Sequence, residues 1–87
     1  MQERKVTVKW RAGLHARRAV DLVNISNKFK SKIMIKKGEI EADAKSILNL
    51  MTLEASYKTS LTVIIKGDDE KDAIKEILDL FNNVDEK

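Results

Sequence analysis

One short stretch combines residue types that can carry out phosphoryl chemistry: Gly13-Leu14-His15-Ala16-Arg17-Arg18-Ala19. It holds the one histidine of the chain. An imidazole nitrogen is a nucleophile near neutral pH because much of the imidazole is unprotonated there. A helix start offers unpaired backbone N–H groups to an anion, and guanidinium groups match phosphate oxygens. The pattern favours a transient phosphohistidine at His15 beside Arg17 and Arg18, although a histidine that only caps the helix would leave the same pattern.

The elements that must position this motif follow from hydrophobic periodicity. Strands are predicted over residues 5–10, 32–36, 39–43 and 60–66, and helices over 16–29, 46–53 and 70–83. Lys37-Gly38 predicts a tight turn between the second and third strands. The order β-α-β-β-α-β-α predicts an α+β open-faced β-sandwich, with a four-stranded antiparallel sheet and three helices on one face. With no repeat or linker, residues 1–87 are expected to form a single domain.

Two helices show apolar stripes that predict which face packs on the sheet. The last helix has the clearer stripe, formed by Ala73, Ile74, Ile77, Leu78 and Phe81. In the first helix, one stripe holds Ala16, Ala19, Val20, Val23 and Asn27, and beside it lie Leu22, Ile25 and Phe29.

Composition and charge narrow the classes of function. The absence of cysteine excludes a disulfide framework and a thiol nucleophile, and with one histidine we expect no metal site and no cofactor. No targeting segment or membrane span is visible, which favours a cytoplasmic protein without direct membrane insertion. Residues 1–37 hold eleven lysines and arginines against two acids, whereas residues 38–87 hold six lysines and twelve acids. Such asymmetry suits an acidic partner or a nucleic acid, or it reflects two solvated faces.

A second motif, Lys45-Ser46-Ile47-Leu48-Asn49-Leu50-Met51, predicts the short helix and what it displays. Ser46 is placed to cap the helix. Leu50 and Leu53 are expected to enter the core, because a short helix on a sheet buries only one side. The remaining apolar residues, Ile47, Leu48 and Met51, would then form an exposed patch that suits a protein partner.

The two motifs, their separation and the chain length resemble those of the histidine-containing phosphocarrier protein (HPr) of the phosphoenolpyruvate-dependent sugar phosphotransferase system. The resemblance covers nearly the whole chain. It implies a carrier rather than an enzyme, in which His15 accepts a phosphoryl group on Nδ1 from enzyme I and passes it to sugar-specific IIA domains. Arg17 matches the arginine that assists, and Ile47, Leu48 and Met51 match the docking surface.

The resemblance also implies a regulatory site. Ser46 matches the serine that an ATP-dependent kinase modifies in some bacteria, so a kinase or phosphorylase acting on Ser46 joins the expected partners. A phosphate there would add negative charge at a helix start that tolerates it, while repelling an acidic partner. We expect the protein to be a monomer.

The chain departs from the family pattern at several positions. Proline is usual where this chain has Arg18, a polar residue is common at Ala12, and glycine is usual at Asn49, Glu54 and Lys58. Arg18 is expected to be exposed, because Arg17 fills the clamp role and adjacent helical positions point about 100° apart. With these departures, a specialised paralogue within the family remains an alternative interpretation.

Two other functions remain open. One is a regulatory module of the same fold that is never phosphorylated on His15. The other is a small basic nucleic-acid-binding domain, against which stands the shortage of aromatic residues for a stacking platform on the open sheet face: Trp10 and Phe81 lie on core stripes.

Overall fold

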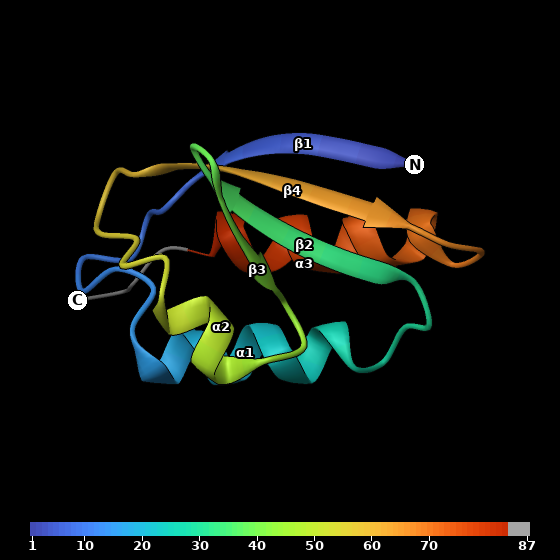
Figure 1. The fold of residues 1–87 in the computed structure, drawn as a ribbon, viewed down its shortest axis with the longest axis horizontal. Coiled ribbons are helices and arrows are strands. Elements are labelled where there is room, and N and C mark those ends of the chain that lie inside the picture. The colour runs from blue at the N-terminus through green and yellow to red at the C-terminus, as the bar shows by residue number, and fades with distance from the viewer. Residues whose placement is uncertain (84–87) are drawn as a thin grey trace.

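The chain forms a four-stranded antiparallel sheet with three helices on one face (Figure 1). The computed structural model describes residues 1–83. The elements in chain order are β1 (Gln2–Thr7), α1 (Ala16–Ser26), β2 (Lys32–Lys37), β3 (Ile40–Asp43), α2 (Ile47–Met51), β4 (Ser60–Lys66) and α3 (Glu70–Asn82). The strand order is β1-β4-β2-β3, so β1 and β3 are the edge strands. The predicted open-faced β-sandwich is confirmed.

The core lies between the helices and one face of the sheet. In β4, the side chains of Leu61, Val63 and Ile65 are buried, while Thr62 and Ile64 between them stay partly exposed on the open face. The core face of α3 consists of Ala73, Ile74, Ile77, Leu80 and Phe81, with Leu78 partly buried at its border. This alternation in the strand and stripe on the helix are what the sequence pattern predicts.

The predicted first strand, 5–10, is wrong at both ends. β1 begins at Gln2 and ends at Thr7, because its backbone pairs with β4 from Gln2↔Ile65 to Thr7↔Ser60. Val8 and Trp10 continue the alternation and are fully buried, but they lie beyond the strand. Periodicity therefore reported which side chains face the core and not where strand pairing stops.

The first helix also ends earlier than predicted, at Ser26 instead of residue 29. The backbone N–H groups of Lys30 and Ser31 donate to the Asp69 carboxylate at 2.8 and 3.0 Å, so the chain has already turned toward the start of α3. Phe29 packs on the core from outside the helix. The predicted stripe is rotated as well: Ala16 and Val20 are exposed, and the buried residues of the helix are Ala19, Leu22 and Ser26.

Two shorter elements differ at their ends. Lys37 pairs with Ile40, so the hairpin turn consists of Gly38 and Glu39 and not of Lys37 and Gly38. Gly38 has φ +61°, a value typical of two-residue hairpin turns. The second helix covers five residues, Ile47–Met51, inside the predicted 46–53.

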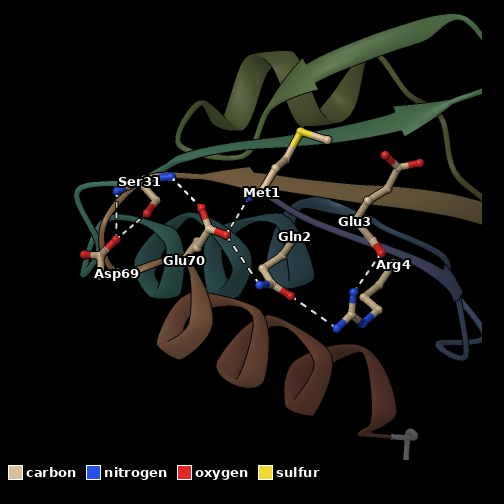
Figure 2. A network of polar contacts seen from close by, with 8 residues as sticks. Met1, Gln2, Glu3, Arg4, Ser31, Asp69 and Glu70 are labelled. Atoms are coloured by element: carbon tan, nitrogen blue, oxygen red, sulfur yellow. Dashed lines mark hydrogen bonds and ion pairs between the residues drawn. The ribbon is translucent and has the colours of Figure 1, made fainter.

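A polar network fastens the start of the chain to the start of α3 (Figure 2). The N-terminal ammonium of Met1 lies 2.7 Å from Glu70 Oε2, and the Gly67 N–H donates to Glu70 Oε1 at 3.0 Å. Beside them the Ser31 hydroxyl donates to Asp69. The ammonium group lowers the pKa of Glu70, and the Ser31 hydroxyl lowers that of Asp69, because both stabilise the carboxylate.

Candidate functional site

His15 is the N-cap of α1, as the sequence predicted. Its backbone is extended, with φ −87° and ψ −177°, and its Nδ1 accepts a hydrogen bond from the Arg17 N–H at 3.3 Å. An acceptor nitrogen carries a lone pair, so Nε2 bears the ring proton in neutral histidine. In this tautomer the Nδ1 lone pair points to the start of α1, where the Arg17 N–H is its donor.

The loop before His15 is held against the loop after α2. The Leu14 N–H donates to the Ala55 carbonyl at 2.8 Å, and the Gly13 N–H donates to the Trp10 carbonyl at 2.8 Å. Gly13 has φ +78°, and a Cβ built there would lie 2.6 Å from the Ala55 oxygen. A side chain at this position would therefore combine backbone strain with a clash, which explains the glycine next to the candidate nucleophile.

The loop after α2 is braced in turn by β2. Lys37 Nζ donates to the carbonyls of Leu53 and Glu54 at 3.0 and 3.3 Å, a cation at the C-terminal end of the helix. Sequence reasoning missed Lys37, because its role depends on the contact between the end of β2 and the loop after α2, which no local pattern reveals. Glu54 and Lys58 adopt positive φ, +48° and +72°, where the family resemblance leads one to expect glycine.

The two arginines have different surroundings. Arg17 is exposed, and its backbone N–H donates to the side chain of the N-cap residue His15. The prediction that Arg18 is exposed is wrong: its side chain is 17% accessible, and its Nη1 lies 3.6 Å from Asp21 Oδ2. Its guanidinium carbon lies 5.1 Å from the centroid of the Trp10 ring. The i,i+3 spacing of Arg18 and Asp21 was a signal for this ion pair that the sequence reasoning did not use.

The short helix presents the predicted surface. Ser46 Oγ accepts a hydrogen bond from the Asn49 N–H at 3.2 Å, which confirms Ser46 as the N-cap. Leu50 and Leu53 are fully buried. The exposed residues Ile47, Leu48 and Met51, hereafter the α2 apolar surface, are 39%, 80% and 38% accessible.

α1, which begins next to His15, packs against α2 (Figure 1). Val20 on α1 is also exposed, at 40%. It was assigned to the buried stripe, so sequence reasoning missed a further apolar side chain on the helix that carries the site.

Asn49 differs from the other two residues at family glycine positions. It lies within α2, and its Oδ1 accepts a hydrogen bond from the Asp43 N–H at 3.3 Å. The side chain thus ties α2 to the end of β3 and needs no special backbone conformation.

Other kinds of site are poorly supported among residues 1–83. No group of three or more histidine, cysteine, aspartate or glutamate side chains is placed there to hold a metal ion. Within the same residues no helix is both long and apolar enough to cross a membrane. A hollow of about 390 Å³ between β1 and α3 is lined by neither His15 nor the α2 apolar surface.

Comparison with known proteins agrees with this geometry. The family model described as "PTS HPr component phosphorylation site" matches residues 2–83. The HPr-like protein Crh of Bacillus subtilis is 38% identical over 77 residues, covering 88% of this chain and 91% of that protein. The phosphocarrier protein HPr of Xylella fastidiosa (strain Temecula1) is 40% identical over 83 residues, covering 95% and 93%.

The fold is shared with solved HPr structures. The crystal structure of HPr-C-His from Thermoanaerobacter tengcongensis superposes with a TM-score of 0.90 at 38% identity, covering 93% of this chain and 91% of that one. Proteins named NPr are also among the relatives. The chain belongs to the HPr family of phosphotransferase-system phosphocarrier proteins.

Proposed function

We propose that this chain accepts a phosphoryl group on His15 from enzyme I and passes it to sugar-specific IIA domains. The observation that carries the proposal is the hydrogen bond from the Arg17 N–H to Nδ1 of His15. It leaves Nδ1 with the lone pair that a nucleophile needs and aims a helix-end donor at the same point. Relatives that are named phosphocarrier proteins support it.

In the proposed step the Nδ1 lone pair of His15 attacks the phosphorus of the phosphorylated donor. The N–P bond forms while the bond between phosphorus and the donor atom breaks, and the donor atom keeps the electron pair. The Arg17 N–H loses Nδ1 as its acceptor and can donate to a phosphoryl oxygen instead. Transfer to the acceptor domain is the same displacement in the opposite direction, so the protein is a carrier and returns unchanged.

Cations would hold the phosphoryl oxygens. Arg17 is exposed at the second position of α1, two residues after His15, which suits its side chain to bind a group on His15. The side chain of Arg18 already contacts Asp21 and Trp10, whereas that of Arg17 is exposed. We therefore assign the two arginines different roles in the site. A guanidinium group suits this work because its fork of donors matches two phosphate oxygens.

Docking of partners would use the α2 apolar surface. An exposed methionine among aliphatic side chains adapts to several partners, as a carrier between two kinds of domain requires. Ser46, which caps the same helix, would be the regulatory phosphorylation site for a kinase and phosphorylase. We propose that a phosphate there acts by charge at the interface, because a helix start accepts an anion without refolding.

The assignment of His15 is tested by mass spectrometry after incubation with phosphoenolpyruvate and enzyme I. We expect one acid-labile phosphate on the parent and on Ser46→Ala, and none on His15→Ala. The Ser46→Ala control excludes the serine as the acceptor, since phosphoserine survives acid. Acid-labile phosphate on His15→Ala would refute the assignment.

The regulatory alternative predicts a different result in the same experiment. A regulatory module that is never phosphorylated on His15 remains the second candidate, and a solved relative is described as Crh, the Bacillus subtilis catabolite repression HPr. An enzyme I that phosphorylates a relative named HPr but not this chain would favour it. The nucleic-acid alternative has lost support, because Trp10 and Phe81 are buried in the core.

Docking control at Ser46 is tested with Ser46→Asp. We expect the apparent KM of enzyme I for this protein to rise several-fold, with little change in kcat. The reason is the negative charge that is added beside the α2 apolar surface. Ser46→Asn keeps a capping side chain without the charge and should behave like the parent. An unchanged KM for Ser46→Asp would contradict the electrostatic account.

We also propose that residues 1–87 act as one cytoplasmic domain and as a monomer. A structure described as an HPr dimer from T. tengcongensis is among the solved relatives, with a TM-score of 0.73 and 39% identity. Sedimentation equilibrium over a range of protein concentrations decides between the two states.

A further inference from the structure

Arg18 is anchored to the core rather than left in solvent. Its guanidinium group lies over Trp10, whose ring is buried and stacks on Phe81 with 5.1 Å between centroids. The polar edge of the Trp10 ring is fixed as well, because Nε1 donates to the Asn83 carbonyl at 2.7 Å. The cation thus rests on a ring that is held in place by α3.

Arg18 lies in the first turn of α1, between Asp21 and the N-cap residue His15 that would carry the phosphoryl group. Asp21 is three residues later, and the Nη1–Oδ2 distance is 3.6 Å. His15 is three residues earlier, at the N-cap, and its Nδ1 accepts a hydrogen bond from the first-turn Arg17 N–H. Because helical side chains lean toward the N-terminus, a move of the long Arg18 side chain from Asp21 toward His15 follows the direction that the helix favours.

We propose that Arg18 exchanges its contacts with Asp21 and Trp10 for the phosphoryl group when His15 is phosphorylated. This inference rests on the proposed function. Asp21 offers one negative charge, whereas a phosphoryl group offers about two and three acceptor oxygens. The guanidinium fork binds such oxygens in pairs, which favours exchange. Asp21 is then the competitor that keeps the grip of Arg18 on the phosphoryl group weak enough for transfer.

The exchange has a consequence for transfer. A stronger hold on the phosphoryl group stabilises the phosphorylated carrier and shifts the exchange equilibrium with enzyme I toward it. Removing the charge of Asp21 should therefore increase the share of phosphorylated protein, and removing the charge of Arg18 should decrease it. A proline at this position, as is usual in the family, has no charge to exchange.

Trp10 is the only tryptophan of the chain, so its indole N–H gives a single NMR signal that reports on the contact. We expect phosphorylation to shift this signal in the parent protein and to leave it nearly unmoved in Arg18→Met, which keeps an unbranched apolar stem. Lys28→Met removes one cation two residues beyond the end of α1 and should shift like the parent. An equal shift in Arg18→Met and the parent would overturn the exchange.

The role of Asp21 is measured by the phosphoryl exchange equilibrium with enzyme I, phosphoenolpyruvate and pyruvate. Asp21→Asn should raise the ratio of phosphorylated to free protein about threefold, which is typical of one partly exposed ion pair. Asp79→Asn, an equal loss of charge on α3, should leave the ratio unchanged. A ratio for Asp21→Asn equal to that of the parent would refute the competition.

Mass spectrometry of the same samples distinguishes a failure of the proposed function from a failure of the contact exchange. Absence of phosphohistidine from the parent refutes the proposed function, and the exchange with it. Phosphohistidine on His15 together with an unmoved Trp10 signal refutes the exchange alone.

Discussion

Replacing Glu54 with glycine should stabilise the protein. Glu54 follows α2 with φ +48°, in the left-handed region that side chains with a Cβ rarely adopt. This conformation costs an L-residue about 1–2 kcal/mol. Glycine escapes that cost but loses about 0.5–1 kcal/mol more backbone entropy on folding. We therefore expect Glu54→Gly to raise the free energy of unfolding by about 0.5–1 kcal/mol.

The measurement is urea unfolding followed by the fluorescence of Trp10, which the core buries completely. A gain of this size moves the thermal midpoint of a chain this long upward by about 2–8 °C. The slope of the unfolding curve should not change, because the surface exposed on unfolding is the same. Lys58→Gly, at φ +72°, should gain less, since Lys58 Nζ lies 5.4 Å from the Tyr57 ring centroid and that contact is lost.

Glu54→Ala is the matched control. It removes the carboxylate as Glu54→Gly does, but keeps a Cβ in the left-handed conformation. We expect it to have nearly the stability of the parent, so the difference between the two variants isolates the backbone effect. Equal stability of Glu54→Gly and Glu54→Ala would refute the reasoning from φ.

Three further changes test other parts of the fold. Ser26→Ala should raise the free energy of unfolding by about 1 kcal/mol in urea, because its buried hydroxyl has no hydrogen-bond partner among residues 1–83; a loss would show that the hydroxyl is satisfied. Gly13→Ala should lower it by at least about 1 kcal/mol in the same assay, because the new Cβ meets the Ala55 carbonyl at φ +78°. Acid should destabilise the protein through Asp69. The folded-state pKa of Asp69 lies below its ordinary 3.8, so its stabilising effect is complete above that pH and disappears as the pH falls through the folded value. Asp69→Asn should flatten the stability–pH curve there, and Asp68→Asn should not.

Much of the fold followed from local patterns. The strand and helix order was predictable because each element buries one face, and the core residues of α2 and β4 lie where the periodicity placed them. Boundaries were harder, because they depend on partners distant in sequence. α1 ends where Lys30 and Ser31 turn to Asp69, which is 38 residues further along the chain from Ser31.

The candidate site was predictable in its residue types and less so in its contacts. His15 caps α1 and Ser46 caps α2 because capping is a local property of the chain. The surroundings of Arg18 were not predictable from helix geometry alone. Trp10 lies under it only because the chain after β1 passes beneath the first turn of α1, a tertiary contact.

The departures from the family pattern share one physical feature. Arg18 stands where proline would restrict the helix start, and Glu54 and Lys58 stand where glycine would relieve a left-handed backbone. In each case a charged side chain replaces a proline or a glycine, which suits the position because of its backbone conformation. Glu54 and Lys58 keep the left-handed backbone conformation despite its cost in free energy. At the third position, contacts with Trp10 and Asp21 fix the Arg18 side chain. Since the loop that carries Glu54 is bonded to the loop that carries His15, these charges alter the face where partners would dock. We therefore expect Glu54 and Lys58 to change partner choice, and Arg18 to change the hold on the phosphoryl group.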